Sequence, residues 1–170
     1  DVKVQKLMET PEVLAAAQRA KEAGSSRFCM GAAWREVRDN KDFDKVLDMV
    51  KGVNEMGLEV CCTLGMLSES QAEKLKNAGL YAYNHNIDTS PENYPNIVST
   101  HPFAERINTL KVAKAAGLSL CSGGIFGMGE EWIDRLDMMF TLREIGVETG
   151  GSNVQWAINP ARSEEHTSEL

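Results

Sequence analysis

The sequence predicts an α/β protein, and more specifically an incomplete (β/α) barrel of the TIM type with about five strand–helix units. The first observation is a repeated glycine, which each time follows a stretch with helical periodicity and precedes a short strand-like run. The second is the resulting alternation of helices and strands, which favours a parallel sheet with helices outside it. A closed barrel needs eight strands and typically about 250 residues, so residues 1–161 are too short to close one. The repeated glycines are Gly24, Gly57, Gly79, Gly117 and Gly146.

The individual elements follow from capping residues and from these glycines. Thr10 is expected to cap the first helix, with Pro11 in its first turn. Ser68 and Gln71 have the spacing of a capping box for the third helix. Glycine readily adopts the left-handed conformation that ends a helix. We therefore expect helices at 11–23, 41–56, 69–78, 102–116 and 130–145, and strands at 26–30, 58–63, 80–86, 118–122 and 152–158.

A doubly wound sheet is the alternative architecture. The segment GGIFGMGEE, residues 123–131, follows a predicted strand as a nucleotide-binding loop would. Its glycines, however, do not have the G-x-G-x-x-G spacing of a dinucleotide site, and no P-loop lysine follows them. The short spacing of the units also favours the barrel over the doubly wound sheet.

Composition restricts the classes of partner. The formal net charge of −7 disfavours binding to nucleic-acid phosphates. No run of 18 apolar residues and no basic amphipathic segment is present, so we expect no membrane role. Residues 162–170, RSEEHTSEL, resemble a translated sequencing adapter, so we exclude them from the fold as a non-native tail and expect the natural chain to continue beyond residue 161.

One face of each predicted strand is polar. Side chains alternate between the two faces of a strand, so the apolar face should meet the helices and the polar face should line the lumen. Barrel interiors are usually filled with branched apolar residues, and buried polar groups are costly unless they are paired. A ligand or a metal cluster would supply those partners. The predicted lumen-facing residues are Arg27, Cys29, Glu59, Cys61, Thr63, Ala82, Asn84, Asn86, Asp88, Ser119, Cys121, Asn153 and Gln155.

Three of these lumen residues are cysteines near the carboxyl ends of their strands, where barrel enzymes hold their active sites. Cys29, Cys61 and Cys121 form a set of soft ligands suited to an iron–sulfur cluster or to zinc. Cys62 falls on the opposite face and should pack against helices. The alternative is that the cysteines are small buried hydrophobes, since no C-x-x-C pair is present. His85 on the helix-facing side and His101 in a loop are interpreted as structural or surface residues.

Four segments in order resemble the biotin synthase family of radical S-adenosylmethionine (SAM) enzymes: RFCMGAAW, EVCCTLGML, YNHNIDTSPE and CSGGIFGMGE. The resemblance covers residues 5–146. It implies a (β/α)₈ barrel of the radical SAM kind that inserts sulfur into dethiobiotin to form biotin, the last step of biotin synthesis. It also implies that a [4Fe–4S] cluster cleaves SAM reductively to a 5′-deoxyadenosyl radical, and that a [2Fe–2S] cluster donates the sulfur.

The resemblance assigns roles to individual residues. Cys29, Cys61 and Cys121 match the three cysteine ligands of the catalytic [2Fe–2S] cluster, with Arg27 beside it. Asn86, with Asn84 and Gln155, matches the contacts to dethiobiotin. The alternative for Arg106 is an ordinary surface position on its helix. The residues matched to SAM are Met30, Gly31 and Ala32 for the methionyl amino group, Arg106 for the methionyl carboxylate, Asp88 for the ribose, and Ile125 and Gly127 for the adenine.

The resemblance also implies parts that lie outside this sequence. The C-x-x-x-C-x-x-C ligands of the [4Fe–4S] cluster are expected just upstream of Asp1, and an arginine ligand of the [2Fe–2S] cluster is expected beyond the end. The isolated fragment should therefore be inactive. For the full-length protein, the resemblance implies a reducing electron-transfer partner, a homodimer and a cytoplasmic location, or the mitochondrial matrix in a eukaryote. Two alternatives stay open. One is another radical SAM barrel enzyme with a different substrate, and the other is a zinc- or thiol-dependent barrel lyase. Metal analysis would distinguish the lyase, because zinc gives no visible absorption.

Overall fold

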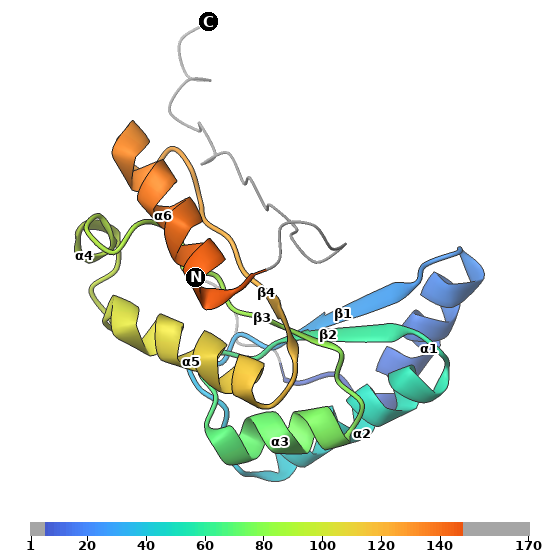
Figure 1. Cartoon of the computed structure of the whole chain (residues 1–170). Coiled ribbons are helices and arrows are strands. Elements are labelled where there is room, and N and C mark those ends of the chain that lie inside the picture. The colour runs from blue at the N-terminus through green and yellow to red at the C-terminus, as the bar shows by residue number, and fades with distance from the viewer. Residues whose placement is uncertain (1–5, 148–170) are drawn as a thin grey trace, which may run out of the picture. The chain divides into compact units, whose positions relative to one another are not determined.

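The computed structural model of the chain describes residues 6–147, whose helices and strands are labelled in Figure 1. These residues divide into two compact units. Within the described residues, the first unit holds residues 6–84 together with Val112–Ser119, and the second holds His85–Lys111 with residues 120–147. Helices and strands alternate along the chain as expected. The elements are α1 (Thr10–Glu22), β1 (Arg27–Gly31), α2 (Lys41–Glu55), β2 (Glu59–Thr63), α3 (Glu69–Asn77), β3 (Ala82–Asn84), α4 (Tyr94–Ile97), α5 (Phe103–Ala115), β4 (Ser119–Cys121) and α6 (Trp132–Ile145).

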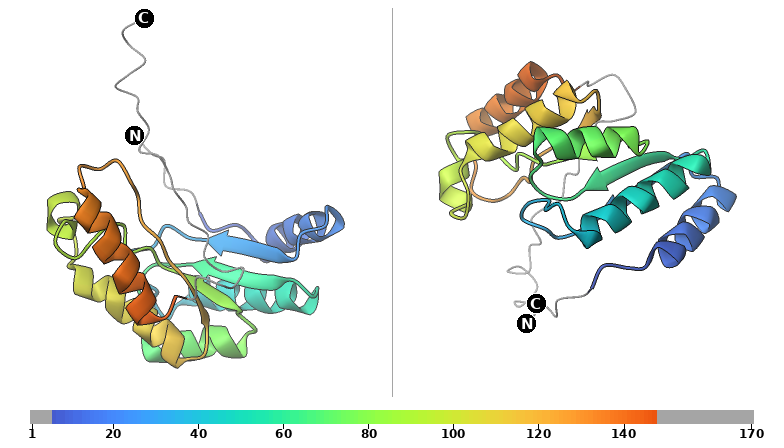
Figure 2. Two further views of the ribbon diagram at one scale, coloured as in Figure 1. Left: turned by 45° about the horizontal axis from the view of Figure 1, so that its top comes forward. Right: turned by 90° about the horizontal axis from the view of Figure 1, so that it is seen from below.

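The sheet is parallel, and its strands follow the order β1-β2-β3-β4. In the first unit β1 pairs with β2 so that Cys29 lies opposite Cys61, and Cys61 in turn lies opposite Ala82 of β3. Helix α2 packs against β2 and against α1 (Figure 2). The parallel pairing confirms the predicted α/β class and fits an incomplete TIM-type barrel.

In the second unit, the chain that follows β3 runs beside the chain that follows β4. The backbone N–H of His85 donates to the carbonyl of Cys121 at 2.9 Å, and the N–H of Ile87 donates to the carbonyl of Gly123 at 3.0 Å. The N–H of Ile125 then donates to the carbonyl of Asp88 at 2.8 Å. These bonds place two of the segments matched to SAM side by side.

The local signals in the sequence have mixed outcomes. The capping box of Ser68 and Gln71 is confirmed, and all five repeated glycines have positive φ. The N-cap at Thr10 is wrong by one residue, because α1 begins at Thr10 and the N–H of Glu9 donates to the Glu12 carboxylate at 3.1 Å. Strand β3 is shorter than the predicted 80–86, and the short helix α4 was not expected. The predicted strand at 152–158 lies outside the described residues.

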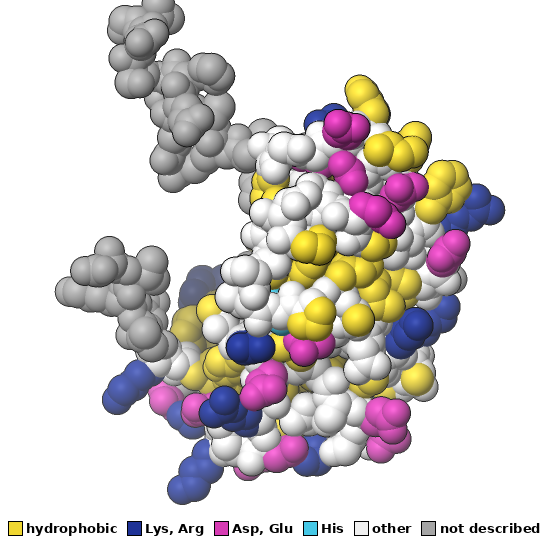
Figure 3. Space-filling view, turned by 90° about the vertical axis from the view of Figure 1, so that its left-hand side faces the viewer, with side chains coloured by type: hydrophobic (Ala, Val, Ile, Leu, Met, Phe, Trp, Pro, Cys, Tyr) yellow, Lys and Arg dark blue, Asp and Glu magenta, His cyan; other side chains and the backbone are white. Residues whose placement is uncertain are grey.

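Helix α6 carries apolar side chains on two sides. Met138, Leu142 and Ile145 are buried in the fold. Further large apolar side chains of this helix are exposed. Figure 3 shows hydrophobic side chains gathered on one face of the molecule. The exposed residues are Trp132, Ile133, Leu136, Met139 and Phe140. Within residues 6–147, no helix is long and apolar enough to cross a membrane.

We expect Gly65→Ala to destabilise the full-length protein more than Gly57→Ala. Both glycines have positive φ, which costs about 1–2 kcal/mol for alanine. An added Cβ at Gly65 would also collide with the carbonyl oxygens of Trp34 and Arg35, the latter at 2.7 Å, whereas no atom lies within 4 Å at Gly57. The expected loss at Gly65 is roughly 3 kcal/mol or more, measured by urea unfolding. Equal losses for the two variants would contradict the packing of this turn.

Candidate functional site

The polar face of the first unit is organised by cross-strand pairs. The Arg27 guanidinium in β1 forms an ion pair with Glu59 in β2, with 2.7 Å between Nη2 and Oε2. The Asn84 side-chain amide in β3 donates to Thr63 Oγ1 in β2 at 3.0 Å. Each pair joins two residues that the sequence placed on the same face. The alternation expected for these strands is therefore confirmed within this unit.

Cys29 and Cys61 lie beside each other on that face. They are register partners in the parallel pairing of β1 and β2, so their side chains project from the same side of the sheet. Cys29 is exposed, whereas the Cys61 residue keeps only 4% of its surface accessible. Two adjacent thiols match the chemistry of a [2Fe–2S] site, which takes thiolate ligands.

Cys62 lies on the opposite face of β2 from Cys61, although both are buried. It lies in the core with 0% of its surface exposed, and burial raises the pKa of its thiol far above the ordinary range, with a smaller contribution from Cys29. A thiol in such a setting is inert as a nucleophile and as a ligand. The structure therefore separates the two adjacent cysteines as the alternation of faces predicted.

The third cysteine of the predicted set belongs to the other unit. Cys121 is buried at the end of β4, in the second unit, whereas Cys29 and Cys61 belong to the first. Among residues 6–147, no group of three or more His, Cys, Asp and Glu side chains is arranged to hold a metal ion. The residues of the first unit fit two ligands of the cluster, and convergence of all three sulfurs stays a prediction.

Arg106 on α5 lies at the centre of a polar cluster in the second unit. Its Nη2 is 2.9 Å from Asp88 Oδ2, and its Nη1 donates to the carbonyl of Asn86 at 2.9 Å. Its Nε donates to Tyr94 Oη at 2.8 Å. The Arg106 and Asp88 side chains keep only 17% and 15% of their surface exposed. The alternative that Arg106 is an ordinary surface residue is therefore wrong.

Asp88 is held in a strained backbone conformation. Its φ of 68° is the one positive value for a residue other than glycine within residues 6–147. Such strain persists only where the surroundings impose it, and it often marks a functional site. Burial raises the pKa of the Asp88 carboxyl, while the nearby Arg106 guanidinium acts in the opposite direction. Since the Asp88 carbonyl also accepts from Ile125, the residues matched to ribose and adenine lie together.

His85 is buried, with 6% of its surface exposed, and its predicted position on the helix-facing side stays a prediction. Burial lowers its pKa to about 4, and the positive charges of Arg106 and His101 act in the same direction. The imidazole is therefore neutral at physiological pH. Among the described residues, its Nε2 meets no hydrogen-bond partner.

The glycine-rich segment after β4 is held by a carboxylate. Both oxygens of Glu130 accept from the N–H of Gly127, at 2.9 and 3.0 Å, and Oε2 also accepts from the N–H of Met128 at 2.8 Å. Arg135 donates to Glu130 Oε1 through Nε at 3.0 Å and Nη2 at 2.7 Å. Burial opposes ionisation, but these hydrogen bonds outweigh it and lower the Glu130 pKa to about 2. Sequence reasoning assigned no role to Glu130, Arg135 or Tyr94. The one signal available for Glu130 was the acidic pair, Glu130 and Glu131, that follows the glycines.

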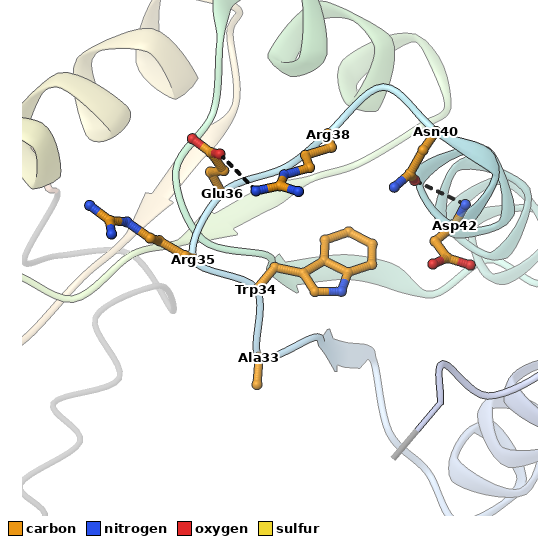
Figure 4. Close-up of a pocket in the computed structure, with 7 residues that line it drawn as sticks. All are labelled: Ala33, Trp34, Arg35, Glu36, Arg38, Asn40 and Asp42. Atoms are coloured by element: carbon orange, nitrogen blue, oxygen red, sulfur yellow. Dashed lines mark hydrogen bonds and ion pairs between the residues drawn. The ribbon is translucent and has the colours of Figure 1, made fainter. Parts of the chain in front are cut away.

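The segment matched to the methionyl amino group leaves the sheet at the end of β1. Gly31 lies opposite Thr63 in the register, and the N–H of Ala32 donates to the Thr63 carbonyl at 3.0 Å. Met30 precedes them within the strand. The chain then enters a polar pocket of about 310 Å³, in which Glu36 and Arg38 pair and Asn40 caps α2 (Figure 4). The pocket is lined by Ala33, Trp34, Arg35, Glu36, Arg38, Asn40 and Asp42, so it adjoins the matched segment without including Met30, Gly31 or Ala32. Gln155 lies outside the described residues.

Comparison with curated proteins finds relatives named biotin synthase. The chain is 64% identical to that of Cytophaga hutchinsonii over 142 residues, which is 84% of this chain and 42% of the relative. It is 58% identical to that of Myxococcus xanthus over 141 residues, covering 83% of this chain and 41% of the relative. The chain thus spans less than half the length of these relatives.

Comparison with solved structures and with family profiles gives the fold. The crystal structure of methylornithine synthase matches with a TM-score of 0.69 at 20% identity, covering 86% of this chain and 42% of that one. At that identity the likeness concerns the fold alone. The sequence profile of the radical SAM superfamily matches residues 2–143. The chain, with its parallel sheet and alternating helices, belongs to the radical SAM superfamily.

Proposed function

We propose that this chain is part of a biotin synthase, which inserts sulfur into dethiobiotin to form biotin. The observation that carries the proposal is the register pairing of Cys29 with Cys61 on the polar face of β1 and β2. A second cluster that supplies sulfur requires thiolates inside the barrel, in addition to the cluster that binds SAM. The identity of 64% to a relative named biotin synthase supports the same assignment.

Cys29, Cys61 and Cys121 are proposed to hold the [2Fe–2S] cluster, while the ligands of the [4Fe–4S] cluster come from outside this sequence. When bound, the two clusters and SAM would supply hydrogen abstraction from dethiobiotin and the sulfur that replaces those hydrogens. Arg27 carries positive charge on the same strand face as Cys29, and its ion pair with Glu59 fixes its position. Asn84, Asn86 and Gln155 are proposed to orient dethiobiotin by hydrogen bonds.

The second unit is proposed to bind SAM. Arg106 presents a planar guanidinium, which binds carboxylates through paired hydrogen bonds, and it is already paired with one carboxylate, that of Asp88. We assign the methionyl carboxylate to Arg106 and the ribose hydroxyls to Asp88. The backbone at Met30, Gly31 and Ala32 would receive the methionyl amino group. Ile125 and Gly127 would contact the adenine, where glycine permits close approach.

The full-length protein is proposed to act on a small molecule and to take electrons from a reducing electron-transfer protein. It is further proposed to be a cytoplasmic homodimer that binds neither nucleic acid nor membrane. The negative net charge of the chain, −7, supports the absence of a nucleic-acid partner.

A complementation experiment tests this function. The full-length gene that contains this segment should let a bacterium lacking biotin synthase grow on dethiobiotin without biotin. The same gene with Cys61→Ser should fail, because hydroxyl oxygen is a poor ligand for iron beside thiolate. Growth that requires biotin, despite normal levels of the expressed protein, would contradict the proposal and favour a radical SAM enzyme with another substrate.

A further inference from the structure

Arg135 on α6 is held between two aromatic rings. Its guanidinium carbon lies 4.9 Å from the centroid of the Phe126 ring and 5.1 Å from that of the Trp132 ring. Both distances are within the range of a cation–π interaction. Trp132 is mostly open to solvent, with 75% of the residue surface exposed. Its cation–π contact is with Arg135. The two rings therefore both contact the guanidinium face.

Arg135 also binds the Glu130 carboxylate, which in turn binds the backbone of the glycine-rich segment. Its Nε and Nη2 both donate to Oε1 of Glu130, and the Glu130 side chain keeps only 2% of its surface exposed. The Glu130 oxygens in turn accept the backbone N–H groups of Gly127 and Met128. The ring of Phe126, which belongs to the same segment, contacts the Arg135 guanidinium. Arg135 is thus linked to the segment twice, through Glu130 and through Phe126.

The segment needs such a support because its own backbone is permissive. Gly127 and Gly129 have φ values of 93° and 89°, in a region that glycine enters and leaves freely. At the other end of the segment, the N–H of Ile125 donates to the Asp88 carbonyl. The contacts of Glu130 and Arg135 therefore hold the other end of the segment, at Gly127 and Met128.

We propose that Arg135 is a positioning residue, which fixes residues 125–129 in the conformation that receives the adenine of SAM. This inference rests on the proposed function, because that function assigns the adenine to this segment. A loop that is already ordered binds its ligand without the entropic cost of ordering. Loss of the Arg135 contacts should therefore weaken SAM binding while leaving the chemistry and the dethiobiotin site intact.

The test uses the full-length protein and equilibrium dialysis with labelled SAM. Arg135→Gln should bind SAM about tenfold more weakly than the wild type, as the loss of a charge-assisted hydrogen bond predicts. Arg143→Gln, at an exposed position two turns further along the same helix, is the matched control and should bind normally. Arg135→Lys keeps the charge but loses the paired geometry, so it should restore part of the affinity.

Two further measurements separate positioning from general destabilisation. Amide hydrogen exchange at Gly127 and Met128 should accelerate in Arg135→Gln, whereas exchange in β1 and β2 should not change. The KM for SAM should rise, while kcat at saturating SAM and the KM for dethiobiotin should stay at wild-type values. Parallel changes in all of these quantities would instead indicate a merely structural role and would overturn the inference.

The failure of this inference is distinguishable from failure of the proposed function. If Arg135→Gln binds SAM like the wild type while Asp88→Ala does not, the positioning role is wrong and the function stands. If the wild-type full-length protein does not bind SAM, the proposed function and the positioning role both fail.

Discussion

Replacing Cys61 by serine in the full-length protein should abolish the [2Fe–2S] absorption and the formation of biotin, whereas replacing Cys62 should spare both. Cys61 lies on the polar face as the register partner of Cys29, and Cys62 is fully buried on the other face. Serine oxygen is a much poorer ligand for iron than thiolate. The measurement is visible absorption of the anaerobically reconstituted variants together with the yield of biotin.

The adjacent residue makes the control unusually well matched. Cys62→Ser changes the same atoms one position along the same strand, and it should cost only packing stability, about 1 kcal/mol. Reductive cleavage of SAM depends on the other cluster, so Cys61→Ser should still release some 5′-deoxyadenosine. A Cys61→Ser protein with the [2Fe–2S] spectrum intact would contradict the ligand assignment.

Replacing Asp88 by alanine should weaken SAM binding by roughly a hundredfold, because the hydrogen bonds of a buried carboxylate to the ribose would be lost. The [2Fe–2S] chromophore should stay, since Asp88 is not among the proposed ligands of that cluster. Equilibrium dialysis with labelled SAM and visible absorption give the two readouts. The expected pattern is the reverse of that for Cys61→Ser.

Asp88→Asn is the control for backbone strain. Asparagine tolerates the positive φ of 68° better than alanine does, and it keeps one acceptor oxygen. It should therefore bind SAM with an affinity between those of the wild type and Asp88→Ala. If Asp88→Asn and Asp88→Ala both bind SAM normally, the ribose assignment is wrong.

The sequence was sufficient for the features that depend on local periodicity. The repeated glycines mark helix ends because positive φ is a local requirement, and the alternation of faces separates Cys61 from Cys62 because side chains in any strand alternate. The shortened β3 was not predictable in this way, since the pattern continues through His85 and Ile87 after the pairing with β2 has ended, where the chain bonds to the end of β4 and the segment that follows it. Sequence pattern specifies a face, but pairing depends on the neighbouring chain.

The contacts of the candidate site were less accessible to sequence reasoning. The ion pair between Asp88 and Arg106 joins a loop to a helix, and no periodicity connects the two. The support of Glu130 by Arg135 depends on how the glycine-rich segment turns back toward α6. Both assemblies are formed by tertiary contacts. The alternation of faces placed Asp88 on the polar side, but only the family resemblance pointed to Arg106, and neither line of reasoning assigned a role to Glu130.

The most direct test of the account is the yield of biotin from dethiobiotin by the full-length protein. The protein would be reconstituted anaerobically with iron and sulfide, and supplied with SAM and a reductant, and the products would be quantified by mass spectrometry. The account predicts biotin together with 5′-deoxyadenosine, and no biotin from the Cys61→Ser variant. Release of 5′-deoxyadenosine without biotin from the wild-type protein, with both clusters present, would contradict it.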